Sequence, residues 1–207
     1  MRLLHLFSGY NTLTDCAMLY DIEVISVDFK NYKNSRPQSF LVDFMDFDYM
    51  RFTPGYFDFI FVGFPCDTFS KASGGYHFKK NCIPVTSAAH KSILMIERLK
   101  LVLYYFSSAK FIIENPTSAL FSNCYFKAIF SSSQLHFYRF HQRNYGHKLL
   151  KQTDFCSNIN SIWLDNPVHR VNGKYSKHTM DNLSYKDRVS YPPLLCQKIL
   201  DFLISNK

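Results

Sequence analysis

The sequence predicts an α/β fold in which a mostly parallel sheet carries helices on both faces. Short apolar runs alternate with amphipathic stretches over residues 1–140, and strands that alternate with helices form parallel sheets. Small or charged residues follow the end of each apolar run. In open α/β sheets those strand ends meet at one edge, where ligands bind.

Five apolar runs have the length and composition of buried strands: Arg2–Phe7, Ile22–Val27, Phe40–Val42, Phe57–Val62 and Lys110–Ile113. A sixth strand is predicted over 135–140, and weaker strand patterns lie near 153–157 and 161–164. Helices are predicted over 11–20, 86–107, 117–130 and from Pro192-Pro193 to about Ile204, because proline suits the first turn of a helix. A long loop is predicted over residues 71–84.

The periodic pattern weakens after about residue 141, where polar and basic residues dominate. We therefore expect an α/β domain over 1–145, a small irregular region over 146–190, and a final helix over 191–207 that returns to the first domain. The chain of 207 residues is long enough to bury a full core.

Charge and cysteine content narrow the class of protein. The net charge of +8 suits a polyanionic partner such as nucleic acid. The six cysteines are scattered without the spacing of a zinc site, so no metal is expected. No apolar run approaches the length of a membrane span. We expect a soluble, intracellular protein with reduced thiols.

The fourth predicted strand ends in Gly63-Phe64-Pro65-Cys66. Pro65 fixes its own φ angle and favours extended geometry at Phe64, so a stiff loop presents Cys66 just past the strand end. The alternative is a buried core thiol, since free cysteine is among the most buried residue types.

Carboxylates end three other predicted strands: Asp28, Asp43 and Glu114. The first strand ends in the small-residue turn FSGYNT (7–12), which lets a ligand approach the backbone. An acidic residue about 20 positions later is the usual acceptor for ribose hydroxyls, and Asp43 is placed to take an amine. Together these residues predict a pocket for an adenosine-containing cofactor.

Cys66 and Glu114 follow neighbouring strands beside that pocket. A thiolate can add to an electron-poor ring carbon while an acid stabilises the charge pushed into the ring. A cysteine hydrolase would instead need a histidine base, and His77 and His90 are not at strand ends.

Five stretches, in order along the chain, now resemble one family. FSGYNT (7–12) resembles the cofactor block FxGxGG, GFPCDTFSKASGG (63–75) resembles GxPCQxFSxAGxxxG, and FIIENP (111–116) resembles the ENV or ENP block. HQRNYGHKLLKQTDFCSN (141–158) resembles the block with a pyrimidine-contacting arginine, and DRVSYPPLLCQKIL (187–200) resembles the closing block. The chain resembles a DNA cytosine-5 methyltransferase, and KQTDFCSN is similar to KPTDIWTN of short, phage-type members.

The resemblance implies a Rossmann-like class I fold dependent on S-adenosylmethionine, with duplex DNA as substrate. It implies that Cys66 adds to carbon 6 of a flipped-out cytosine while Glu114 contacts the ring and Arg143 braces the ring oxygen, with Arg139 as the alternative arginine. Cofactor contacts are implied for Phe7, Ser8, Gly9, Asn11, Thr12, Asp28, Asp43, Phe64 and Pro65. DNA contacts are implied for Ser70, Lys71, Lys79, Lys80, Asn115 and Arg139.

The sequence departs from the family pattern at three places. The cofactor turn reads Tyr10-Asn11-Thr12 where the block FxGxGG has a variable residue and two glycines, and Asp67 replaces the common glutamine or threonine after the nucleophile. The segment left for target recognition, about 157–185, is short, so a protein partner or a second copy is an alternative source of specificity. Two other functions stay open: a methyltransferase fold that only binds DNA or a partner, and methylation of cytosine in RNA.

Overall fold

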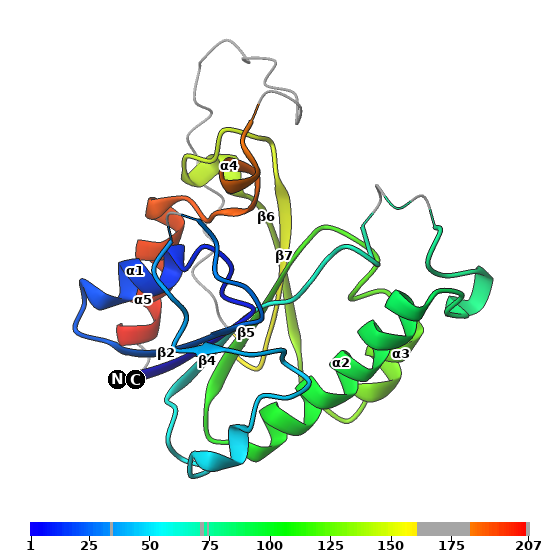
Figure 1. Cartoon of the computed structure of the whole chain (residues 1–207), viewed down its shortest axis with the longest axis horizontal. Helices are drawn as coiled ribbons and strands as arrows, with labels where there is room; N and C mark the ends of the chain where they lie inside the picture. Colours follow the sequence, from blue (N-terminus) through cyan, green and yellow to red (C-terminus); the bar gives the residue numbers. More distant parts are fainter. Residues whose placement is uncertain (34, 71–72, 74, 161–182, 206–207) are drawn as a thin grey trace.

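The computed structural model describes residues 1–33, 35–70, 73, 75–160 and 183–205 (Figure 1). Lys71, the strand pattern near 161–164 and most of the expected recognition segment lie outside the described residues. The rest of the chain forms one seven-stranded sheet with helices packed against it.

The sheet has the strand order β3-β2-β1-β4-β5-β7-β6. The parallel strands are β1 (Arg2–Leu6), β2 (Glu23–Asp28), β3 (Phe40–Leu41), β4 (Phe59–Gly63) and β5 (Lys110–Pro116). The antiparallel pair β6 (His136–His141) and β7 (Gln152–Ser157) extends it, with β7 beside β5. The predicted α/β class with a mostly parallel sheet is therefore confirmed.

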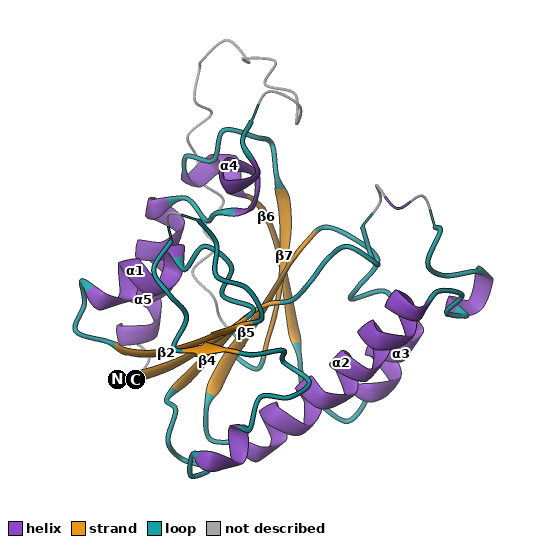
Figure 2. Cartoon of the chain, viewed as in Figure 1, coloured by secondary structure: helices purple, strands orange, loops and turns teal. Residues whose placement is uncertain are grey.

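Helices cover both faces of the sheet (Figure 2). On one face α1 (Thr12–Met18) packs with α5 (Pro193–Ser205), and on the other α2 (Ser87–Tyr105) packs with α3 (Cys124–Ile129). Alternation along β1 explains this arrangement, because Leu3 faces the α1–α5 side while Leu4 and Leu6 face α2. A short helix, α4 (Tyr185–Val189), precedes α5 and was not predicted.

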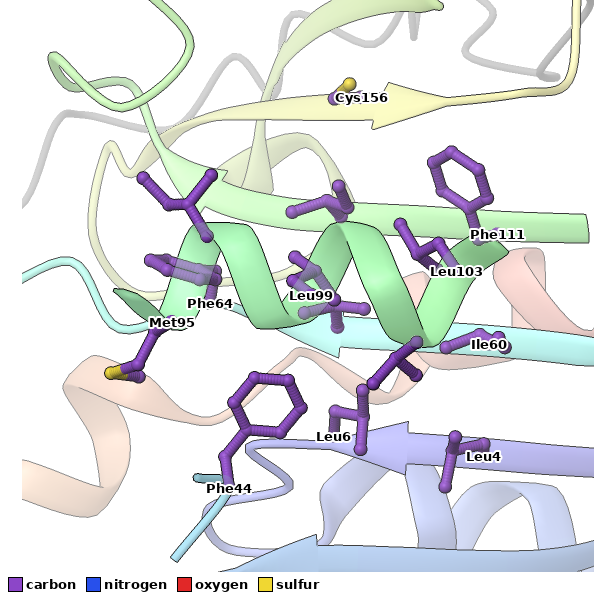
Figure 3. Close-up of a cluster of buried hydrophobic side chains, with 14 of the residues drawn as sticks. Leu4, Leu6, Phe44, Ile60, Phe64, Met95, Leu99, Leu103, Phe111 and Cys156 are labelled. Carbon is purple, nitrogen blue, oxygen red and sulfur yellow. The ribbon is translucent and has the colours of Figure 1, made fainter. Parts of the chain in front are cut away.

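The larger core lies between α2 and the sheet (Figure 3). Leu99 and Leu103 of α2 lie over Ile60 of β4 and Leu6 of β1. Phe64, the residue that follows β4, also enters this core and is 3% exposed. Burial of a side chain of this size contributes roughly 1.5–3 kcal/mol, so the core itself anchors the loop that carries Cys66.

The helix predicted over 117–130 is wrong in its first half. Helix α3 begins only at Cys124, after Asn123 caps it by accepting a hydrogen bond from the N–H of Tyr125. Before that, the N–H of Thr117 donates to Gln152 and the N–H of Ala119 donates to Phe69. These long-range bonds hold residues 117–122 as turns, which local helical periodicity does not reveal.

Candidate active site at the strand ends

The loop that presents Cys66 is clamped to the neighbouring strand. The N–H of Phe64 donates to the carbonyl of Glu114 at 3.2 Å, and the Asn115 side-chain amide donates to the carbonyl of Phe64 at 2.8 Å. Asn115 is itself fixed by the hydroxyl of Ser118, which donates to its Oδ1 at 2.6 Å. The backbone N–H and the backbone carbonyl of Phe64 are thus both bonded to β5, and these two bonds fix where Cys66 lies relative to Glu114.

Gly63 is the register partner of Glu114 across β4 and β5. A Cβ at this position would lie 3.0 Å from the carbonyl oxygen of Phe7 and 3.1 Å from the Tyr191 hydroxyl. A side chain here would collide with backbone on one side and with Tyr191 on the other. The glycine therefore keeps three segments close together at the strand ends.

Cys66 is half-buried, and its thiol is protonated at neutral pH. Burial raises the pKa of Cys66 to about 11, helped by the negative charges of Asp67 and Glu114 and opposed by Lys151. A thiolate is the nucleophilic form, so chemistry at Cys66 requires a change in this electrostatic balance.

Glu114 is almost fully buried and has two side-chain donors. The Tyr191 hydroxyl donates to Oε2 at 3.0 Å, and the Gln142 amide donates to Oε1 at a longer 3.4 Å. Burial raises the pKa of Glu114, whereas Lys151 and the Tyr191 hydrogen bond oppose that rise. The carboxyl group is consequently suited to hold a proton. A proton on Glu114 would remove one of the negative charges that disfavour the Cys66 thiolate.

The cation whose charge acts on both Cys66 and Glu114 is Lys151. Its ammonium lies 5.9 Å from the centre of the Tyr191 ring. The sequence interpretation chose Arg143 instead, which lies in the 3-10 turn Gln142–Tyr145 next to the Gln142 that bonds Glu114. Lys151 is the first residue of KQTD, so the sequence did contain a signal for it.

Arg139, the alternative arginine, is engaged elsewhere. Its guanidinium forms a two-pronged ion pair with Asp154, with N···O distances of 2.7 and 3.0 Å. Asp154 also accepts a hydrogen bond from Thr117. Because both residues sit on the adjacent strands β6 and β7, this pair braces the antiparallel edge of the sheet.

A pocket of about 200 Å³ lies at the ends of β1, β2 and β4. Four predicted cofactor residues line it: Phe7, Asp28, Asp43 and Pro65. Phe29, Phe44, Lys91 and Met95 also line it and were not predicted. Phe29 is 67% exposed, and its position directly after Asp28 at a strand end is the signal that could have found it.

The two carboxylates of the pocket differ in their environment. Asp28 accepts hydrogen bonds from the N–H groups of Gly9 at 2.9 Å and Lys30 at 3.1 Å, and burial raises its pKa. Asp43 forms an ion pair with Lys91 at 2.6 Å, which lowers its pKa. A carboxylate has about four acceptor positions, so Asp28 retains capacity for hydroxyl donors of a ligand.

The turn FSGYNT has an unusual backbone. Phe7, Gly9 and Asn11 have positive φ angles of 55°, 54° and 59°, although phenylalanine rarely adopts this conformation. The Asn11 amide donates to the carbonyl of Arg36, and Thr12 accepts the N–H of Tyr191. These two residues hold neighbouring segments in place. The Ser8 hydroxyl is buried and has no hydrogen-bond partner among the described residues. Buried polar groups normally have a partner, so this hydroxyl is a candidate for a bond to a ligand.

The residues predicted to contact DNA fall into two groups. Lys79 and Lys80 are exposed, and the Ser70 carbonyl accepts two bonds from Ser73. Asn115 is buried and bonded within the protein, and Arg139 is ion-paired with Asp154 while its side chain stays 61% exposed. The predicted DNA contacts of these residues stay predictions.

No protein-family model and no curated protein sequence matches the chain. Solved structures do match its fold. The Entamoeba histolytica methyltransferase EhMeth superposes with a TM-score of 0.56 at 13% identity, over 80% of this chain and 55% of that one. A protein described as a putative DNA modification methyltransferase encoded within an E. coli prophage gives 0.54 at 13% identity, over 76% and 46%. The fold is that of a Rossmann-like methyltransferase. The chain spans about half the length of these structures.

Within this methyltransferase fold, the pocket residues fit an adenosine-containing cofactor such as S-adenosylmethionine. In the pocket, Asp28 can accept hydroxyl donors and the rings of Phe7 and Phe29 provide apolar surface. Ser8, which follows Phe7 in the chain, has a buried hydroxyl that lacks a partner among the described residues. No group of metal-ligating side chains occurs within the part of the chain that the structure describes. No helix among those residues is long and apolar enough to cross a membrane.

Proposed function

We propose that this chain is an S-adenosylmethionine-dependent cytosine-5 methyltransferase that acts on DNA. The observation that carries the proposal is the proximity of Cys66 to Glu114. Glu114 lies opposite Gly63 at the ends of β4 and β5, its charge acts on the Cys66 thiol, and Pro65 beside Cys66 lines the Asp28 pocket. A thiol and a proton-holding carboxyl at neighbouring strand ends suit addition to a polar ring followed by substitution on it. The bound cofactor would supply an electrophilic methyl group.

Each side chain has a task in this mechanism. Protonated Glu114 donates to ring nitrogen 3 of an extruded cytosine and withdraws charge from the ring. That proton also removes the Glu114 charge, which acts together with burial and Asp67 to hold the pKa of Cys66 high. The Cys66 thiol therefore gives its proton to solvent water more readily when the base is bound. Cys66 then adds to carbon 6, and carbon 5 becomes nucleophilic toward the methyl group. Loss of the carbon 5 proton and departure of the thiolate complete the reaction.

Other residues orient these groups. Asn115 and Gly63 position the Cys66 loop against β5. Asn115 bonds the carbonyl of Phe64, and the absence of a side chain at Gly63 permits the close approach. Tyr191 and Gln142 fix the Glu114 carboxyl, and Lys151 supplies positive charge to the site. We assign the role of active-site cation to Lys151 in preference to Arg143. Exposed Lys79 and Lys80 remain candidates for phosphate contact, and the net charge of +8 favours a nucleic-acid substrate.

The test is transfer of radiolabelled methyl groups from S-adenosylmethionine to duplex DNA and, in parallel, to transfer RNA. We expect transfer to DNA that is lost in Cys66→Ala and retained in Cys16→Ala. DNA with 5-fluorocytosine should trap a covalent adduct through Cys66. Transfer to RNA alone would replace the proposed substrate.

Calorimetry with S-adenosylhomocysteine separates an inactive fold from a wrong substrate. Binding without methyl transfer to either nucleic acid would overturn the enzymatic proposal and leave a cofactor-binding module. Absence of binding would overturn the cofactor assignment as well.

A further inference from the structure

Two thiols outside the candidate active site, those of Cys82 and Cys124, lie close together. Cys82 ends the 3-10 turn Lys80–Cys82, and Cys124 begins α3, which lies beside that turn (Figure 1). The N–H of Cys124 donates to the Cys82 sulfur at 3.1 Å, and the Cys124 thiol donates to the Asn81 carbonyl at 3.7 Å. Both cysteines are free, Cys124 is exposed and Cys82 is half-buried.

From this geometry we propose that Cys82 and Cys124 are an oxidation site that forms a reversible intramolecular disulfide. The Cys124 backbone N–H lies 3.1 Å from the Cys82 sulfur, so the two cysteines are neighbours in the folded chain, and the nearby Cys82 thiol raises the pKa of Cys124. Asn81 and Cys82 have positive φ angles of 63° and 61°, so a sharp turn directs the chain back at this point. A disulfide between them requires the two side chains to rotate until the sulfur atoms meet.

The other four cysteines are less suited to oxidation. Cys156 and Cys196 are fully buried, and burial raises the pKa of both thiols. Cys16 lies near Cys196, but burial and Asp201 raise its pKa as well. Cys66 is a protonated thiol in the free protein. The pKa of Cys124 is raised too, so position distinguishes this pair: Cys124 is exposed to oxidants and Cys82 lies directly beside it. A sulfenic acid formed on Cys124 therefore has a second thiol next to it.

The chemistry balances with a peroxide as oxidant. The thiolate of one cysteine attacks a peroxide oxygen, the O–O bond breaks, and hydrogen peroxide leaves one oxygen on sulfur as a sulfenic acid while the other departs as water. The second thiol attacks that sulfur, the S–O bond breaks, and a second water leaves. Two thiols are oxidised, one peroxide is reduced, and a dithiol such as dithiothreitol reverses the result.

The cross-link would join the two chain segments that leave the active site. Cys82 follows the loop that carries Cys66, and Cys124 follows the strand that carries Glu114. The two cysteines are 42 positions apart, and closing a loop of that length removes entropy from the unfolded chain. We expect the oxidised protein to melt on the order of 5–10 °C higher than the reduced one.

The experiment treats the full chain with one equivalent of hydrogen peroxide, alkylates free thiols, and maps peptides by mass spectrometry without reduction. We expect a linked pair of peptides that contain Cys82 and Cys124, a rise in melting temperature, and reversal by dithiothreitol. Cys124→Ser should abolish the link, whereas the matched variant Cys16→Ser should retain it. The peptide map of the oxidised wild-type protein shows whether Cys82 and Cys124 are linked, even if a variant fails to fold.

Three results would overturn the proposal: a link between Cys16 and Cys196 instead, a covalent dimer through Cys124, or separate alkylation of both cysteines after peroxide. The mapping does not involve methyl transfer, so it succeeds or fails separately from the proposed function.

Discussion

The hydrogen bond from Tyr191 to Glu114 can be tested without assuming any activity. Tyr191→Phe removes only the hydroxyl and leaves the ring, whose edge packs against Phe61 at a centroid distance of 5.5 Å. Glu114 would keep only the longer bond from Gln142 at 3.4 Å. A buried carboxylate would thus lose its best donor while it remains out of contact with water.

The size of the effect follows from the charge on the acceptor. A hydrogen bond to a charged group contributes about 1.5–3 kcal/mol, and its loss raises the pKa of Glu114 further, because the ionised carboxyl loses a donor. Burial has already raised this pKa above the reference value of 4.5. The folded state therefore binds more protons than the unfolded one, and stability is lost as pH rises through the folded pKa. Tyr191→Phe should enlarge that loss at pH 8 and have a smaller effect at pH 4.

The assay is urea unfolding of both proteins at pH 4, 6 and 8. Tyr105→Phe is the matched control, because its hydroxyl donates to the neutral carbonyl of Phe52 at 2.9 Å. We expect the control to lose about 0.5–1.5 kcal/mol of unfolding free energy at every pH. Tyr191→Phe should lose about 1.5–3 kcal/mol at pH 8 and less than that at pH 4. Equal losses at pH 4 and pH 8 for Tyr191→Phe would refute the assigned role of Tyr191.

Three further outcomes are expected. Asp67→Asn should speed alkylation of Cys66 at pH 8 by about three- to tenfold, since the Asp67 charge helps to hold the pKa of Cys66 at about 11. An equal gain in alkylation rate in the surface control Asp48→Asn would contradict this cause. The pKa of buried His5 is lowered to about 3, so the unfolded chain takes up a proton below pH 6.5 that the folded chain does not. Stability should fall toward pH 3 by up to about 1.4 kcal/mol per unit, and His5→Gln should remove that slope in unfolding measurements. Asp28→Asn should weaken S-adenosylhomocysteine binding about tenfold or more in calorimetry, and unchanged affinity would place the cofactor elsewhere.

The strands of the parallel part of the sheet and the residues that follow them were largely predictable from the sequence, whereas their order in the sheet was not predicted. Buried parallel strands read as apolar runs with clear ends, so Asp28, Cys66 and Glu114 could be placed at one edge of the sheet from the sequence alone. The pocket that Asp28 and Asp43 line agrees with that placement.

Errors arose where local patterns compete with distant partners. Residues 117–122 have helical periodicity but are held as turns by bonds to Gln152 and Phe69. The Asn115 side chain, for which the resemblance implies a DNA contact, is fully buried and bonded to the carbonyl of Phe64, a partner that the sequence does not reveal.

The sequence by itself determined the class of fold and the candidate nucleophile, because strand burial and the Gly-Phe-Pro-Cys loop are local properties. Only the tertiary structure decided how the Glu114 carboxyl is held. Tyr191 reaches it from 77 positions away, and β7 pairs antiparallel with β5 next to Lys151. Hydrogen bonds and charges act over a few ångströms in space. Residues far apart in the sequence come within that range only when the whole sheet and its helices have packed.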